Sequence, residues 1–111
     1  MENLEMAQHR LAPVGDLSHG EIRPFNIEGR YVLLVQGELG PALIDGICPH
    51  AGGDLGKGSV SGNRIKCPTH NYLFDLQTGV SPLGRREGWG PAGVYALEEV
   101  DGYLCVEFPE A

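Results

Sequence analysis

The chain has 111 residues, a formal net charge of −7 and a hydrophobic fraction of 41%. This length suits one domain with one hydrophobic core. The acidic balance argues against nucleic acid as a partner, because binding phosphate requires a basic surface. No stretch approaches the roughly 18 consecutive apolar residues that indicate a membrane span. The acidic start, residues 1–6, lacks the pattern of a secretory signal, so we expect a cytoplasmic protein that does not contact a membrane.

Short apolar runs separated by turn residues predict an all-β fold, a small antiparallel sandwich or barrel. We expect a loose leader over residues 1–7 and a single domain over residues 8–111. Residues 80–93 are rich in Gly and Pro and are expected to be irregular, and no segment shows a helical period. Asp101-Gly102 predicts a hairpin turn between the last two strands. The predicted strands cover 10–14, 22–27, 31–35, 42–45, 58–60, 64–66, 72–75, 94–100 and 103–108.

Two segments each combine one cysteine with one histidine, Cys48-Pro49-His50 and Cys67-Pro68-Thr69-His70. A Rieske [2Fe–2S] centre needs two thiolates on one iron and two imidazoles on the other. Structural zinc also accepts two Cys and two His, but commonly from one Cys pair and a separate His pair. In this chain cysteine and histidine ligands alternate, which favours an iron–sulfur cluster and leaves zinc as the alternative. A catalytic Cys–His dyad would leave the second pair unexplained.

The two segments resemble the bacterial Rieske-type ferredoxins over residues 48–55 and 67–79, and the likeness extends across most of the chain. The resemblance implies one [2Fe–2S] cluster per chain and a β-sandwich with a small cluster-binding subdomain near residues 46–80. It also implies the ligands. These are Cys48 and Cys67 on the inner iron, with His50 and His70 on the outer iron near the surface.

The residues around the motif indicate which kind of Rieske centre to expect. Rieske proteins of the cytochrome bc complexes carry an extra cysteine in each loop, and this chain has none there. They also place a serine and a tyrosine after the second histidine, where this chain has Tyr72 and Phe74. Phenylalanine cannot donate to sulfur, and fewer donors lower the potential. We predict a midpoint in the lower part of the roughly −150 to +300 mV Rieske range.

The resemblance implies a one-electron carrier with no catalytic site of its own. It would take electrons from a flavoprotein reductase and pass them to a terminal oxygenase of the ring-hydroxylating type, by transient docking. The run His70-Asn71-Tyr72 is also similar to the small subunit of assimilatory NAD(P)H nitrite reductase. A permanent subunit of such a reductase is therefore the alternative.

Several other sequence features are each compatible with two interpretations. The acidic surface suits docking onto a basic partner patch, or it only maintains solubility. The run Arg85-Arg86-Glu87 is a solvated charge cluster or a docking site. The resemblance implies that a proline loop covers the cluster, at Ser81-Pro82-Leu83 or at Trp89-Gly90-Pro91. The alternative is that each is an ordinary surface loop. Cys105 is expected to be a packing residue on the last strand, in preference to a redox role.

Overall fold

The computed structural model describes residues 6–49, 52–68, 72–88 and 90–109, which form three antiparallel sheets. The first sheet has the order β1 (Met6–Pro13), β10 (Tyr103–Pro109), β9 (Glu98–Val100). The middle sheet has the order β2 (Ile22–Ile27), β3 (Arg30–Gly37), β4 (Gly40–Asp45), β8 (Val94–Tyr95). The third sheet has the order β5 (Ser59–Ser61), β6 (Arg64–Lys66), β7 (Leu73–Asp75). The short helices are η1 (Leu55–Lys57) and α1 (Pro82–Glu87). The predicted all-β fold is confirmed.

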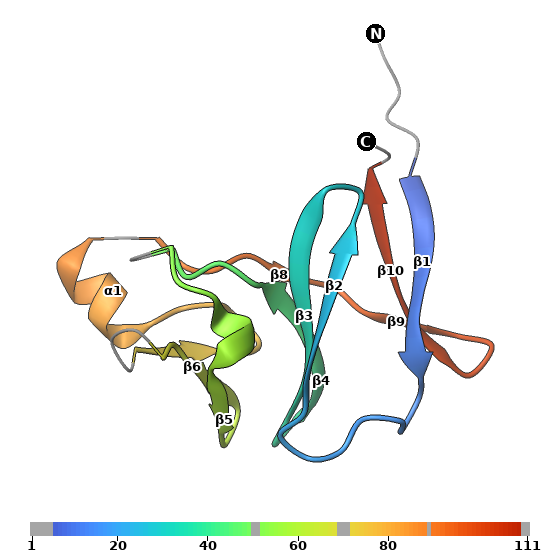
Figure 1. The fold of residues 1–111 in the computed structure, drawn as a ribbon, viewed down its shortest axis with the longest axis horizontal. Helices are drawn as coiled ribbons and strands as arrows, with labels where there is room; N and C mark the ends of the chain where they lie inside the picture. Colours follow the sequence, from blue (N-terminus) through green and yellow to red (C-terminus); the bar gives the residue numbers. More distant parts are fainter. Residues whose placement is uncertain (1–5, 50–51, 69–71, 89, 110–111) are drawn as a thin grey trace, which may run out of the picture.

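Strand β3 is buried on both of its faces and so separates two hydrophobic cores. Its side chains point alternately to opposite sides of the sheet. Val32 and Leu34 belong to a first core shared with the first sheet, whereas Leu33 and Val35 belong to a second core shared with the third sheet. All four side chains have 0% exposure. The middle sheet therefore lies between the other two, as Figure 1 shows, with β1 and β10 at one end and β5, β6 and α1 at the other.

The two cores differ in composition. The first core consists of Leu11, Ala12, Leu17, Ile27, Val32, Leu34, Leu43, Leu104, Val106 and Phe108. The second core consists of Leu33, Val35, Ile44, Cys48, Leu55, Ile65, Cys67, Phe74, Leu76 and Ala92. Both cysteines of the predicted metal site thus lie in the second core.

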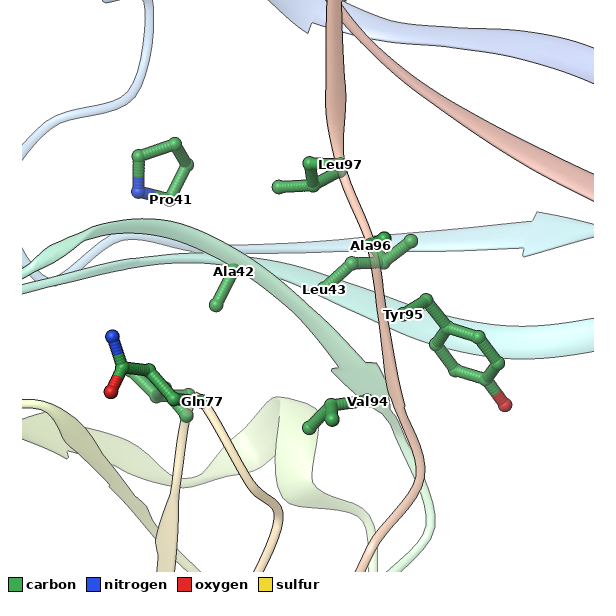
Figure 2. Close-up of a pocket in the computed structure, with 9 residues that line it drawn as sticks. Pro41, Ala42, Leu43, Gln77, Val94, Tyr95, Ala96 and Leu97 are labelled. Atoms are coloured by element: carbon green, nitrogen blue, oxygen red, sulfur yellow. The ribbon is translucent and has the colours of Figure 1, made fainter.

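The single strand predicted over residues 94–100 is wrong, because the chain changes sheets within it. β8 pairs with β4 of the middle sheet, whereas β9 pairs with β10 of the first sheet. Ala96 and Leu97 form the crossing between them. Figure 2 shows that this crossing lines an open pocket together with residues of β4 and with Gln77. None of the residues lining this pocket belongs to the Cys–His segments.

A short helix occupies part of the region that we expected to be irregular. Helix α1 begins after Ser81, whose backbone is extended, and Pro82 stands at its first position, where the missing N–H costs nothing. It ends at Gly88, which adopts φ 87° and donates its amide to the Gly84 carbonyl. Six residues are too few to show a helical period, which explains why the sequence pattern does not reveal this helix.

Strand β1 overlaps the leader expected over residues 1–7. Met6 and Ala7 pair with Pro109 and Phe108 of β10, which extends the first sheet to the start of the described chain. The boundaries of the domain and of its cluster-binding part remain predictions. Within the described ranges, no helix is long and apolar enough to cross a membrane.

Candidate metal centre

The two cysteines of the Cys–His segments are buried together in the second core. Cys48 has 1% exposure and Cys67 has 0%. Neither forms a disulfide, and Cys105 forms none either. Cys105 is buried in β10, where its thiol lies 3.7 Å from the carbonyl oxygen of Tyr103. Two thiols in one apolar core can supply the two thiolate ligands of a metal centre, while the third is separate from them.

Each of these two cysteines stands at the base of a loop that is closed in the same way. The Cys48 amide donates to the carbonyl of Gly53 at 2.7 Å, and the Cys67 amide donates to the carbonyl of Tyr72 at 2.7 Å. Donor and acceptor are five residues apart in both loops. We call these segments the first ligand loop (48–53) and the second ligand loop (67–72). The bases of the two loops are closed alike although their sequences differ.

Strands and bridges hold the bases of both ligand loops. Below the first loop, Ile47 and Asp54 form an antiparallel bridge, and the Leu55 amide donates to the Gly46 carbonyl at 2.8 Å. The second loop joins β6 to β7 at the paired residues Lys66 and Leu73. Each loop is therefore the tip of a hairpin.

The predicted histidine ligands, His50 and His70, belong to these tips in sequence but lie outside the described residues. Within the described ranges, no group of three or more Cys, His, Asp and Glu side chains is placed to hold a metal ion. Trp89, in one of the two candidate proline loops, also lies outside the described residues.

Tyr31 of β3 fixes the base of the first ligand loop. Its hydroxyl donates to Asp54 Oδ1 at 2.7 Å, and the same oxygen accepts the Gly56 amide at 2.8 Å. The Gly46 amide donates to the Tyr31 carbonyl at 2.9 Å. A Cβ on Gly46 would lie 2.4 Å from the Tyr31 ring, so the loop base packs directly on this ring. Burial, and then the Asp54 carboxylate, raise the pKa of Tyr31.

A second tyrosine–aspartate pair lies at the end of β4, three residues before the first ligand loop. Asp45 ends β4, and its carboxylate accepts the Tyr95 hydroxyl and, at 3.1 Å, the Gly93 amide. The Asp45 amide donates back to the Gly93 carbonyl at 2.8 Å. Burial, and then the hydrogen bond to Asp45, raise the pKa of Tyr95.

Sequence reasoning missed both tyrosines, because a tyrosine in an apolar strand reads as a packing residue. The signal that could have found Tyr31 is the pair Gly46 and Gly56. A Cβ at Gly56 would lie 2.6 Å from the Tyr31 hydroxyl oxygen, so both glycines make room for this one side chain.

The second ligand loop depends on a close approach of backbones. A Cβ on Gly58 would lie 1.9 Å from the Lys66 carbonyl oxygen, immediately before Cys67. Phe74, with 0% exposure, belongs to the same core as both cysteines. The Phe74 ring, which has no hydrogen-bonding group, thus shares the core of the two thiols.

The chain belongs to the Rieske [2Fe-2S] domain family, whose model matches residues 7–85. Membership brings the family's cofactor, a Rieske [2Fe–2S] cluster. The donor set fits this cofactor, since the core offers two buried thiols at the bases of two alike loops, each with a histidine in its sequence. The chemistry that such a cluster supplies is the gain and loss of single electrons.

The curated relatives include both oxygenase and ferredoxin components. The oxygenase component of 3-ketosteroid-9-alpha-monooxygenase from Mycolicibacterium smegmatis is 39% identical over 83 residues, or 70% of this chain and 21% of the relative. The ferredoxin component of the naphthalene 1,2-dioxygenase system from Pseudomonas putida is 31% identical over 68 residues, or 60% of this chain and 64% of the relative. The chain thus spans about a fifth of that oxygenase component but nearly two thirds of the ferredoxin.

Solved structures show the same fold over nearly the whole chain. The ferredoxin of Sphingomonas yanoikuyae B1 has a TM-score of 0.78 at 24% identity, covering 93% of this chain and 100% of its own. A protein from Mycobacterium tuberculosis described as an NADH-dependent nitrite reductase small subunit has a TM-score of 0.79 at 16% identity, with coverages of 96% and 99%.

A third structure is of the complex between reduced oxygenase and oxidized ferredoxin in carbazole 1,9a-dioxygenase. It has a TM-score of 0.75 at 23% identity and covers 86% of this chain and 97% of the matched one. At such identities these likenesses show the fold alone.

Proposed function

We propose that Cys48, Cys67, His50 and His70 hold one [2Fe–2S] cluster, with the cysteines on the inner iron and the histidines on the outer iron. The observation that carries this proposal is the pair of alike ligand loops, each closed from its cysteine amide to a carbonyl five residues on. Loops closed alike at their bases can present equivalent ligands to the two sides of one binuclear cluster. Zinc, the alternative occupant that the sequence pattern left open, would give a colourless protein.

We further propose that the chain is a low-potential, cytoplasmic electron carrier that accepts electrons from a flavoprotein reductase and passes them to a terminal oxygenase. The ferredoxin structure that matches over its full length supports a carrier. The imidazoles of His50 and His70 would be the route for the electron. Such contacts are small and weak, because a carrier has to dissociate as readily as it binds.

The second candidate is the small subunit of an NAD(P)H nitrite reductase, favoured by the fold match to that kind of subunit. Size-exclusion chromatography of the protein from its native cells separates the two. A carrier elutes as a small protein on its own, whereas a permanent subunit elutes with a large flavin-containing partner.

The midpoint potential tests the kind of cluster. Phe74 lies in the core that contains both thiols and offers no donor to the sulfurs, so the oxidised cluster is favoured. A redox titration followed by EPR should give a midpoint in the lower part of the roughly −150 to +300 mV Rieske range. A value above about +100 mV on that scale would contradict the assignment.

A further inference from the structure

Positive charge gathers at the end of the molecule that carries the ligand loops. Residues 46–88 contain five of the eight Lys and Arg residues but only three of the fifteen Asp and Glu residues. Their formal charge is therefore +2, and the rest of the chain carries −9. The five cationic residues are Lys57, Arg64, Lys66, Arg85 and Arg86.

Three of these arginines line one pocket of about 410 Å³. Arg64 comes from β6, and Arg85 and Arg86 come from the last turn of α1. The ion pairs identified by distance among the described residues belong to His9 and Arg23. The remaining lining residues are Asp75, Thr78, Val80 and Pro82.

Asp75 is the one acidic residue that lines this pocket, and its carboxylate is already engaged. Its Oδ1 accepts the Gln77 amide at 2.8 Å and the Thr78 amide at 3.0 Å, which closes the turn after β7. The pocket is lined by three guanidinium groups and by one carboxylate that already accepts two backbone amides. The lining therefore carries an excess of positive charge. We call Arg64, Arg85 and Arg86 the arginine patch.

The arginine patch borders the second ligand loop. A smaller pocket shares Arg64 and Pro82 with the one above and is also lined by Tyr72 and Leu83. Tyr72 is the residue whose carbonyl closes the loop on Cys67. A protein that contacts the arginine patch would therefore lie beside the loop that carries His70 in its sequence.

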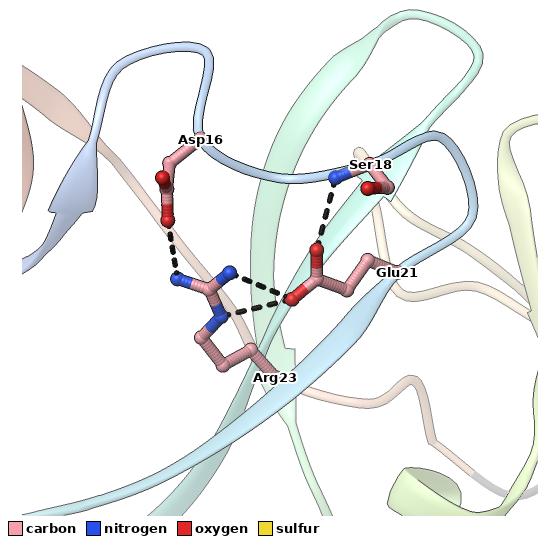
Figure 3. A network of polar contacts seen from close by, with 4 residues as sticks. All are labelled: Asp16, Ser18, Glu21 and Arg23. Atoms are coloured by element: carbon pink, nitrogen blue, oxygen red, sulfur yellow. Dashed lines mark hydrogen bonds and ion pairs between the residues drawn. The ribbon is translucent and has the colours of Figure 1, made fainter.

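Two of the three arginines outside residues 46–88 are held by local partners. Arg23 binds Glu21 at 2.7 Å and Asp16 at 3.0 Å, as Figure 3 shows. The Ser18 amide, and then the Arg23 guanidinium, lower the pKa of Glu21. Arg10 stacks 4.6 Å above the Tyr103 ring. The excess negative charge of the protein, a formal −9, belongs to the residues outside 46–88.

We propose that the arginine patch docks an acidic surface of the redox partner protein beside the second ligand loop. The proposal rests on the proposed electron-carrier function and specifies the chemistry of its partner. Guanidinium groups bind carboxylates in a bidentate, charge-assisted manner. Screening confines this attraction to about 8 Å at physiological salt. The local +2 charge, and not the total of −7, therefore decides which surface can approach the loop.

Stopped-flow oxidation of the reduced holoprotein by ferricyanide, a small anionic probe, tests the local charge. We expect the rate constant to fall as ionic strength rises, although the whole protein is acidic. Arg85→Glu/Arg86→Glu should lower the rate at low salt about tenfold, within the range known for electrostatic steering. The single variants Arg85→Glu and Arg10→Glu form a matched pair, because they change the total charge equally. Only Arg85→Glu should slow the reaction.

Sodium poly-L-glutamate, an acidic polypeptide, then tests docking itself. It should slow the ferricyanide reaction of the wild type and leave that of the double variant unchanged. A wild-type rate that rises with salt, equal rates for the matched variants, or no competition by poly-glutamate would each overturn the proposal. The EPR spectra of the reduced wild type and of each reduced variant are recorded first. A wild type without a Rieske signal would refute the proposed carrier function and not the docking proposal.

Discussion

The two cores of this protein are built for different tasks. The first core contains only apolar side chains and is enclosed by strands such as β1, β3 and β10, of eight, eight and seven residues. The second core contains two thiols and is covered by β5, β6 and β7, of three residues each. Strands this short gain little from pairing alone. The comparison indicates that the long strands hold the fold, while the ligand region depends on its cluster and on close backbone fits.

Strand β3 links the two regions, because successive side chains enter opposite cores. Tyr31, one residue before this alternation, also bonds to Asp54 at the base of the first ligand loop. Strand β3 thereby helps to position the first ligand loop, although β3 contributes no predicted metal ligand.

Removing one thiol should have the largest effect on the ligand region. Cys67→Ser should strongly reduce iron binding and the visible absorption, because a serine hydroxyl is a much poorer iron ligand than a thiolate. Metal binding contributes directly to the folding free energy of the region that supplies the ligands. In hydrogen exchange, amides of β5, β6 and β7 should lose protection while those of β1, β3 and β10 keep it.

Cys105→Ser is the matched control for this experiment. Cys105 is equally buried, at 0% exposure, but lies in β10. Its replacement should leave the iron content and the EPR spectrum unchanged. Equal loss of iron in both variants would show that the second core is not the site of the thiolate ligands.

A close backbone fit should be nearly as sensitive. Gly58→Ala would place Cβ 1.9 Å from the Lys66 carbonyl oxygen, so β6 has to move. We expect a loss of about 3 kcal/mol in the free energy of unfolding, at the upper end of overpacking effects. Urea unfolding of the holoprotein, followed by visible absorption, measures this loss. Gly90→Ala, where a Cβ meets nothing within 4 Å, should be close to neutral.

Removing the hydrogen bond that links the two regions should have a smaller effect on the free energy of unfolding. Tyr31→Phe removes the donor to Asp54 Oδ1 and should cost about 1–2 kcal/mol, since a part-buried acceptor loses one of its two partners. Urea unfolding measures this cost. Tyr103→Phe, which also deletes one hydroxyl, is the control and should cost less. Equal costs would mean that the Tyr31–Asp54 bond does not position the loop.

The same variant should change the alkaline pH dependence. Because the pKa of Tyr31 is raised on folding, the folded state holds this proton more tightly. The resulting stability is complete below the unfolded value of about 10 and is lost as pH rises through the folded pKa. Tyr31→Phe should therefore reduce the slope of stability against pH above about 10.

The sequence was sufficient for local features and insufficient for relations between distant segments. The strand at 22–27, the strand at 64–66 and the turn at Asp101-Gly102 were predicted and are confirmed, since alternation and turn chemistry are local. The joining of Cys48 and Cys67 in one core was predicted from ligand chemistry.

The remaining features depend on tertiary contacts. Alternation over residues 94–100 cannot reveal that the two halves pair with different sheets. The hydrogen bond from Tyr31 to Asp54 joins residues 23 positions apart, and no local pattern encodes it. The clustering of Arg64 with Arg85 and Arg86 arises only when β6 and α1 come together.

The nitrogen couplings of the reduced protein test the central claim most directly. Pulsed EPR of the dithionite-reduced protein should detect two strongly coupled imidazole nitrogens on a [2Fe–2S] cluster. His50→Ala and His70→Ala should each abolish this signal, whereas His19→Ala, which removes a histidine outside both ligand loops, should leave it intact. A cluster without nitrogen coupling, or a colourless zinc protein, would contradict the assignment of Cys48, His50, Cys67 and His70 as its ligands.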